Sequence, residues 1–210
     1  MSERYLEDPD VQLMLRVRNG EIAAFDELAR LYAQVLTNFC AKFVGSFILA
    51  EDLAQDVLLK VLKAGPTYVP TAKFRTWLLT IATNVCLNRK RWQKKHGHLS
   101  LDTRIGDESS PTRAENLAED GAMPNDRMDQ NEMIKRVRQA ILELPESQRA
   151  ALILARYHEL SYAEIGAIME LSLMAVKSLL NRAKDNLREK LSREIRDFVV
   201  VNPETEGQLS

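Results

Sequence analysis

The sequence predicts an all-α protein made of two small helical domains joined by a flexible acidic linker, the C-terminal domain containing a helix-turn-helix. Apolar residues recur at steps of three and four in two blocks, residues 10–96 and residues 133–191. The segment between the blocks loses this periodicity. No stretch alternates apolar and polar residues as a half-buried strand does. These three observations predict helices and no sheet.

Length and composition indicate an ordinary soluble protein with room for two small domains, since domains commonly hold about 100–150 residues. The chain has 210 residues, of which 45% are hydrophobic and 28% are charged. No apolar run approaches the ~20 residues that a membrane-spanning helix needs. The first residues are polar and acidic, unlike a secretory signal, and predict a cytoplasmic protein.

The residue types that carry catalysis or bind metals do not form a recognisable site. Cys40 and Cys86 each lie within an apolar helical pattern, which predicts buried and unreactive thiols. His96, His98 and His158 lack the spacing of metal ligands. No paired carboxylates, activated nucleophile or phosphate-binding loop is evident. We therefore expect no catalytic residue, no bound metal, no cofactor and no enzymatic activity.

Four helices are predicted within residues 10–96. Asp10 can cap the first helix, which ends near Gly20. The second helix ends at Gly45. Its apolar face is predicted to contain Phe25, Leu28, Tyr32, Val35, Leu36, Phe39 and Phe43.

A proline-containing loop separates the third helix, from about Ala50 to Ala64, from the fourth, from about Lys73 to Lys95. Gly65, Pro66 and Pro70 interrupt the helical pattern, because proline lacks an amide donor and disfavours helix before it. The buried faces of the two helices are predicted to contain Leu53, Val57, Val61, Phe74, Leu78, Ile81 and Val85.

Residues 97–130 are predicted to form the linker. They are rich in Ser, Asp, Glu and Asn, and too little of them is apolar to offset the entropy of ordering. A basic cluster precedes the linker and comprises Arg89, Lys90, Arg91, Lys94 and Lys95. The net charge is −1, so a basic surface beside an acidic segment can bind DNA while the chain stays near neutral.

The helical pattern resumes near Met133 and contains a helix pair with the features of a helix-turn-helix. Ser161 and Glu164 form a capping box at the start of a short helix. Ser172 can cap the long helix that follows, and Gly166 allows the two helices to approach closely. The core face of the long helix is predicted to contain Val176, Leu180, Ala183, Leu187 and Leu191.

In a helix-turn-helix, the second helix enters the major groove of DNA. Here its outward positions carry side chains that can donate hydrogen bonds to phosphates and base edges. They are Lys177, Ser178, Asn181, Arg182, Lys184 and Arg188. The alternative is that these residues form only the solvated face of an ordinary helical hairpin.

The fourth helix carries a second candidate surface, a polar and aromatic stripe opposite its core face. The stripe comprises Trp77, Thr80, Asn84, Asn88, Arg91 and Lys95, with Tyr68 in the preceding loop. Such a surface suits single-stranded nucleic acid, because bases stack on aromatic rings and cations follow the backbone. The alternative is that Trp77 belongs to the core and the other residues form a solvated face.

Four sequence motifs occur in the order typical of a known family. They are residues 50–57 (Ala-Glu-Asp-Leu-Ala-Gln-Asp-Val), residues 74–84 (Phe-Arg-Thr-Trp-Leu-Leu-Thr-Ile-Ala-Thr-Asn), residues 144–149 (Leu-Pro-Glu-Ser-Gln-Arg) and residues 160–165 (Leu-Ser-Tyr-Ala-Glu-Ile). Through these motifs, residues 10–196 resemble the extracytoplasmic-function group of bacterial RNA polymerase σ factors, in the σ70 family.

The resemblance implies a function for each part of the chain. Residues 1–96 would dock on core polymerase and open the −10 promoter element, and residues 131–196 would recognise the −35 element. Residues 97–130 would link the two domains and residues 197–210 would form a tail. The implied partners are core RNA polymerase, through its β′ clamp and β flap, promoter DNA and an anti-σ factor.

The resemblance also assigns individual residues. Those that match the face toward the polymerase β′ clamp helices are Asp52, Gln55 and Asp56. Those assigned to the −10 element are Tyr68, Phe74, Arg75, Trp77, Asn84, Asn88 and Arg91. Those assigned to the −35 element are Lys177, Ser178, Asn181 and Arg182. Flipping a base costs a few kcal/mol, which a preformed pocket offsets.

The chain departs from the family pattern at Leu179, where the family often has an arginine, and in the loop that contains Pro66 and Pro70. Two other functions stay open at this stage. One is a regulator that binds operator DNA without polymerase, and the other is a helical adaptor that binds only protein. Binding to core polymerase, followed by transcription from a cognate promoter, would separate the three.

Overall fold

The computed structural model describes residues 5–96, 124–158 and 160–201, apart from the side chains of residues 90–96, 124–131, 157 and 193–201. The helices in these ranges are α1 (Pro9–Arg18), α2 (Ile22–Val44), α3 (Phe47–Ala64), α4 (Phe74–His96), α5 (Pro124–Leu142), α6 (Glu146–Tyr157), α7 (Tyr162–Met169) and α8 (Leu173–Val201), with a short 3-10 turn, η2 (Gly65–Thr67). The described residues contain no strand, so the predicted all-α class is confirmed.

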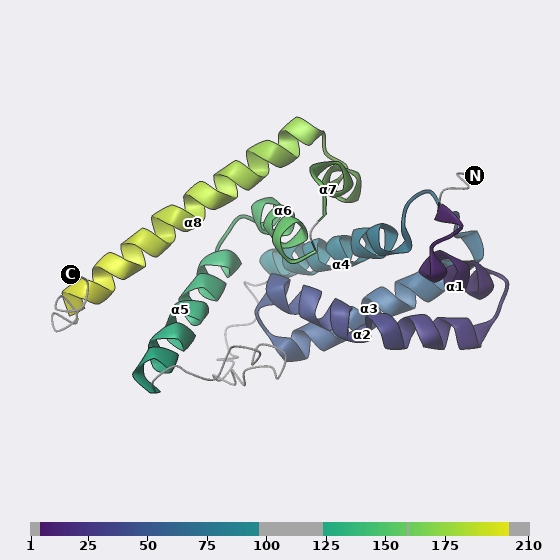
Figure 1. Cartoon of the computed structure of the whole chain (residues 1–210), viewed down its shortest axis with the longest axis horizontal. Helices are drawn as coiled ribbons and strands as arrows, with labels where there is room; N and C mark the ends of the chain where they lie inside the picture. Colours follow the sequence, from purple (N-terminus) through teal and green to yellow (C-terminus); the bar gives the residue numbers. More distant parts are fainter. Residues whose placement is uncertain (1–4, 97–123, 159, 202–210) are drawn as a thin grey trace.

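Helices α1 to α4 form an N-terminal bundle in which the long helices α2 and α3 pack against each other and against α4 (Figure 1). The apolar faces predicted from the helical period meet in its core. Its largest fully buried side chains include Met14, Leu28, Leu36, Phe39, Phe43, Phe74, Leu78 and Leu79. Val35, expected in this core, is 36% exposed.

Several helix ends follow from local signals. Gly45 ends α2 with φ 76°, a left-handed conformation that glycine adopts without steric cost. The Ser161 Oγ accepts a hydrogen bond from the Glu164 amide at 3.3 Å, and the Ser161 amide donates back to the Glu164 carboxylate at 2.9 Å. The Ser172 Oγ accepts from the Ala175 amide at 3.2 Å at the start of α8. These three predicted ends are confirmed.

The first and third helices begin elsewhere than predicted. The cap of α1 is Asp8 rather than Asp10, because Pro9 fits the first helical position, where its missing amide donor costs nothing. Helix α3 begins at Phe47, and its cap is Ser46, whose Oγ accepts from the Leu49 amide at 3.4 Å. In both helices the capping residue lies just before the apolar pattern starts.

Part of the predicted linker is helical. Helix α5 begins at Pro124, so residues 124–130 of the predicted linker are helical. Proline favours this beginning, because the amide donor that it lacks would have no acceptor within the first turn of a helix. Residues 97–123, the remainder of the predicted linker, lie outside the described residues.

The four C-terminal helices pack together and also rest on the N-terminal bundle (Figure 1). Helix α8 lies against α5, α6 and α7. Across to the bundle, α7 packs on α4, while α5 and α6 contact α2. The sequence did not predict this contact between the two halves.

The two cysteines are buried, as predicted, and they are also neighbours. Their Sγ atoms lie 3.7 Å apart, joining α2 to α4 within the N-terminal core. The hydrogen bond with Cys40, together with burial, raises the pKa of the Cys86 thiol. A raised pKa disfavours the Cys86 thiolate, and burial keeps both sulfur atoms away from solvent.

Candidate nucleic-acid and protein interfaces

The stripe predicted on α4 lies at the surface of the bundle. Asn84 and Asn88 are exposed, and Trp77 and Thr80 are half-buried. The Thr80 hydroxyl donates to the Thr76 carbonyl at 2.9 Å, a bond within the helix. The side chains of Arg91 and Lys95 lie outside the described residues. The described members therefore form one accessible row of amides with an aromatic ring at its start.

Two residues assigned to base contact, Tyr68 and Phe74, lie in the core instead. Their exposed fractions are 3% and 1%, and burial raises the pKa of Tyr68 to about 12. Trp77 packs against both, with ring centroids 4.9 Å from Tyr68 and 5.7 Å from Phe74. Neither buried ring presents a face to a base in this structure. In this arrangement the two rings are buried away from solvent and pack against Trp77.

Arg75 lies away from the stripe. Two positions along an α-helix correspond to a turn of about 200° around its axis, so Arg75 and Trp77 lie on nearly opposite sides of α4. The Arg75 guanidinium faces His158 of the C-terminal half, with Nη2 3.3 Å from the ring Nδ1. In this arrangement Arg75 belongs to the contact between the two halves.

The helix pair α7 and α8 has the predicted tight turn. The Leu171 amide donates to the Gly166 carbonyl at 2.9 Å, and Glu170 is left-handed with φ 57°. A Cβ on Gly166 would lie 2.7 Å from the Leu171 carbonyl oxygen, which is too close for any other residue. Hydrogen bonds from Ser161 lower the pKa of Glu164 and keep the capping box charged. The turn holds the start of α8 in a defined orientation.

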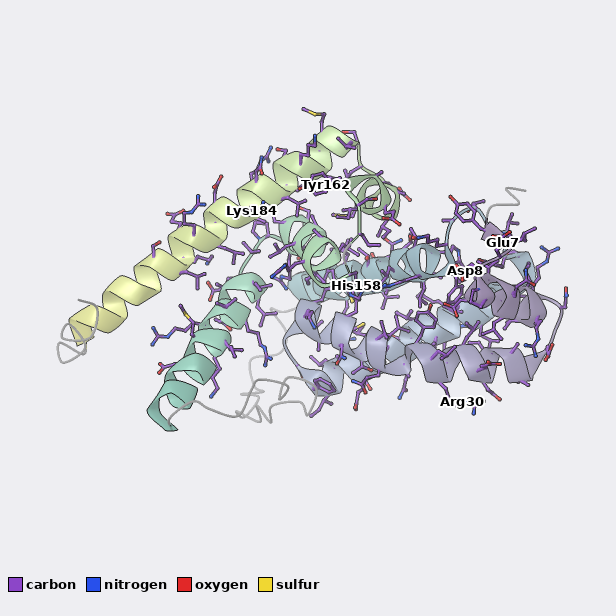
Figure 2. The ribbon with its side chains drawn as sticks, viewed as in Figure 1. Glu7, Asp8, Arg30, His158, Tyr162 and Lys184 are labelled. Carbon is purple, nitrogen blue, oxygen red and sulfur yellow. The ribbon has the colours of Figure 1, made fainter. Side chains whose placement is uncertain are left out.

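The outward side of α8 presents the polar row predicted for it. Lys177, Asn181 and Arg182 are exposed, and Ser178 is half-buried and accepts from the Arg182 Nη2 at 2.9 Å. Further members are the exposed Lys184, labelled in Figure 2, and Arg188. On the opposite side, the core residues with exposed fractions under 5% are Val176, Leu180 and Ala183. The row therefore consists of cationic side chains, a hydroxyl and an amide. All of these groups can donate hydrogen bonds to base edges or phosphates.

Helix α3 presents a third surface, this one acidic. Asp52, Gln55 and Asp56 are exposed, whereas the adjacent Leu53 and Val57 are buried. Exposed carboxylates repel phosphates, so this surface suits a protein partner better than DNA.

Arg149 of α6 joins the two halves through the backbone. Its side chain is 5% exposed, and its guanidinium donates to the carbonyls of Phe43 at 2.7 Å, Leu144 at 2.9 Å and Leu142. Burial lowers the pKa of Arg149. One cation thereby satisfies a carbonyl near the end of α2, one at the end of α5 and one in the turn that follows α5. No local signal could have revealed this role, because Phe43 and Arg149 are 106 positions apart.

His158 is a second buried contact between the halves (Figure 2). Its ring packs edge-on against Phe39, with centroids 5.2 Å apart. Arg75 can only donate, so the Nδ1 that faces it must accept, which requires a neutral ring. Burial, followed by the charges of Arg75 and Lys42, lowers the pKa of His158 to about 4.

We expect the contact at His158 to weaken in acid. The pKa of His158 in this structure is below its ordinary 6.5. The contact therefore contributes its full stabilisation above pH 6.5 and weakens as the pH falls toward 4. When His158 is fully protonated, the contact has lost about 3 kcal/mol of stabilisation. Small-angle scattering between pH 7.5 and 5 would detect expansion of the chain. His158→Gln, which cannot titrate, should remove this pH dependence. An unchanged profile in the variant would show that other groups cause the expansion.

No cluster of three His, Cys, Asp or Glu side chains in the described ranges could hold a metal ion. Within the same ranges, no helix is both long enough and apolar enough to cross a bilayer.

Comparisons with known proteins match both halves of the chain to one family. Residues 28–96 match the family Sigma-70 region 2, and residues 134–187 match Sigma-70, region 4. The chain is 30% identical over 176 residues to the ECF RNA polymerase sigma factor SigW of Bacillus subtilis, covering 84% of this chain and 93% of SigW. It is also 30% identical over 192 residues to the ECF RNA polymerase sigma-E factor of Escherichia coli, covering 89% and 96% of the two chains.

Solved structures share the fold. CnrH in complex with the cytosolic domain of CnrY matches with a TM-score of 0.62 at 22% identity, over 89% of this chain and 99% of CnrH. The sigma factor RpoE of Bartonella quintana, in complex with the anti-sigma factor NepR, matches with a TM-score of 0.61 at 24% identity, over 80% and 96% of the two chains. At these identities the likeness concerns the arrangement of the helices.

Proposed function

Because the chain belongs to the extracytoplasmic-function group of the σ70 family, we propose that it directs core RNA polymerase to promoters that carry a −10 and a −35 element. The observation that carries the proposal is the exposed row of donors on α8, which begins directly after the capped, glycine-dependent turn. A recognition helix needs this combination, since its first turns must meet base edges at a fixed angle. In this role the chain is an initiation factor without chemistry of its own.

We assign the two elements to the two halves. Residues 1–96 dock on polymerase and open the −10 element through Trp77, Asn84, Asn88 and Arg91. Residues 131–196 bind the −35 element through Lys177, Ser178, Asn181 and Arg182. Residues 97–130 connect them, the last seven as the start of α5, and residues 197–201 continue α8 beyond the half that binds DNA. Arg75 remains a candidate for −10 binding only when the contact with His158 opens.

The protein partners follow from the same assignment. Asp52, Gln55 and Asp56 form an exposed acidic face on α3, which supports docking on the β′ clamp helices of core polymerase. The C-terminal half would meet the β flap. Because the related RpoE was solved in complex with the anti-sigma factor NepR, an anti-σ factor is a further candidate partner. Action on polymerase and the chromosome would place the protein in the cytoplasm.

The isolated chain is expected to bind promoter DNA weakly and to bind it tightly only with core polymerase. Its net charge is −1, and the acidic residues before α5 repel phosphates when no partner covers them. Anisotropy of a labelled promoter at physiological salt, with and without core polymerase, measures this. A promoter with both elements scrambled is the control, and run-off transcription from the intact promoter tests the function itself.

Two rival functions predict other outcomes. Sub-micromolar, sequence-specific binding by the isolated chain would favour an operator-binding regulator and contradict the proposal. Binding to protein with no effect of DNA in either assay would favour an adaptor. The proposal requires DNA binding that depends on both polymerase and promoter sequence.

Leu179→Arg is expected to strengthen dependence on the −35 element. Leu179 is half-buried and packs at the edge of the core, beside the exposed row of α8. An arginine there can bond a guanine bidentately, which is worth ~1–3 kcal/mol of discrimination. The measurement is transcription from promoters with intact and scrambled −35 elements.

Leu179→Lys is the matched control for this substitution. It adds the same charge without the planar fork of arginine. A larger −35 dependence for arginine than for lysine supports the assignment. Equal −35 dependence in wild type and both folded variants would place Leu179 away from the groove.

A further inference from the structure

The segment that leads into α4 is held by α1. The Arg18 guanidinium of α1 donates to the Tyr68 carbonyl at 3.2 Å. A Cβ on Gly65 would lie 3.2 Å from a methyl group of Val17, so α1 and the turn η2 are in close contact. Helix α1 therefore packs along the chain that carries Tyr68 and begins α4.

Asp8 makes the most direct of these contacts, because its carboxylate caps two helices at once. One oxygen, Oδ1, accepts from the Asp10 amide of α1 at 3.0 Å. The other, Oδ2, accepts from the Phe74 amide, the first of α4, at 3.3 Å. The first amides of a helix have no partner within the helix, and the positive end of its dipole attracts an anion. Figure 2 labels Asp8 where α1 and the start of α4 meet.

The aromatic group beneath Trp77 is linked to the same helix. Phe74 packs edge-on against Tyr32, with ring centroids 5.3 Å apart. The Tyr32 hydroxyl in turn donates to the Asp10 carboxylate of α1. Trp77 lies about one helical turn after Phe74, whose amide is bonded to Asp8, and its ring packs against Phe74 and Tyr68. Contacts from α1 therefore reach this group through Asp8, Asp10 and Arg18.

We propose that Asp8 is a positioning residue for promoter opening: by capping α1 and α4 together, it holds Trp77 at the place where a base of the −10 element is captured. The proposal rests on the function proposed above. Asp8 itself touches no DNA in this scheme. It acts through the Phe74 amide, which sets where the first turn of α4 lies.

Asp8→Ser separates this role from a general contribution to the stability of α1. Serine is a good helix cap and keeps an acceptor for the first amides of α1, but it offers one short-range oxygen and cannot also reach Phe74. Asp8→Asn is the second variant, because it keeps the size of the side chain and replaces one acceptor oxygen by a donor group. Glu7→Gln is the control, since it removes the same charge from the exposed neighbouring position.

The experiment uses the full-length chain with core polymerase, on duplex promoter and on the same promoter with a premelted −10 region. Permanganate reactivity of unpaired thymines measures opening, and competition with a labelled σ factor measures polymerase affinity. We expect Asp8→Ser and Asp8→Asn to slow duplex opening about fivefold. Polymerase affinity and transcription from the premelted template should stay within about twofold of wild type and of Glu7→Gln.

Two outcomes would overturn the inference. Equal opening by wild type and both Asp8 variants would show that the second cap does not matter. An equal loss on duplex and premelted templates, with weaker polymerase binding, would show that Asp8 only maintains the fold. Failure of the proposed function looks different, because wild type itself would then give no promoter-dependent transcription.

Discussion

Arg149→Met is expected to lower the free energy of unfolding by about 3–5 kcal/mol. Methionine approximates the apolar stem of arginine but carries no donor. The carbonyls of Phe43, Leu144 and Leu142 would lose the guanidinium that bonds them, in a place where the side chain is only 5% exposed. Buried acceptors without a partner each cost roughly 1–3 kcal/mol. Urea denaturation followed by circular dichroism measures the change.

Arg156→Met provides the control for this result. Arg156 lies on the same helix, α6, and is exposed, so its loss should change the free energy of unfolding by less than about 0.5 kcal/mol. If Arg149→Met is no more destabilising than Arg156→Met, the three carbonyls find other donors and Arg149 does not hold the two halves together. A scattering measurement on Arg149→Met would further show whether the C-terminal half has separated from the bundle.

Trp77→Ala and Asn84→Ala are each expected to slow promoter opening about tenfold while leaving polymerase binding intact. Trp77 is the half-buried ring at the start of the stripe on α4, and stacking of one base on an aromatic ring is worth ~1–3 kcal/mol. Asn84 is exposed two turns further on and offers both a donor and an acceptor to a base edge. Permanganate reactivity of the −10 thymines measures the effect.

Asn84→Ala is the more informative of the two, because Asn84 contributes nothing to the core. Trp77→Ala also removes packing against Tyr68 and Phe74, so its thermal stability must be measured alongside. Asn38→Ala on α2 replaces the same residue type outside the stripe and should open the promoter normally. Normal opening by both stripe variants would mean that the stripe is only a solvated face.

The sequence by itself determined the helices and the turn of the C-terminal pair. The capping box of Ser161 and Glu164, the Ser172 cap and the left-handed Gly45 are formed by residues within four positions of one another. Such bonds depend on local backbone geometry, so the order of residues along the chain is enough to predict them. The outward row of α8 was predictable for the same reason, because a helical period alone separates it from the core.

Only the tertiary structure decided which side chains of the −10 candidates reach the surface. Tyr68 lies in a loop, and nothing local shows that Arg18 of α1 bonds its carbonyl or that Trp77 packs on its ring. Arg75 belongs to the motif assigned to the −10 element, but a partner 83 positions away in the C-terminal half faces it. Burial depends on which helices meet, and that is a property of the whole packed chain.

The same reason explains why the double cap of Asp8, the bonds of Arg149 and the neighbouring thiols were not predicted. Asp8 and Phe74 are 66 positions apart, Phe43 and Arg149 are 106 apart, and Cys40 and Cys86 are 46 apart. In each pair the two groups come from distant parts of the chain, so the contact exists only once the helices that carry them have packed together. The sequence therefore determined the helices and their outward polar faces, whereas the packing between helices determined which of those faces remain open to DNA.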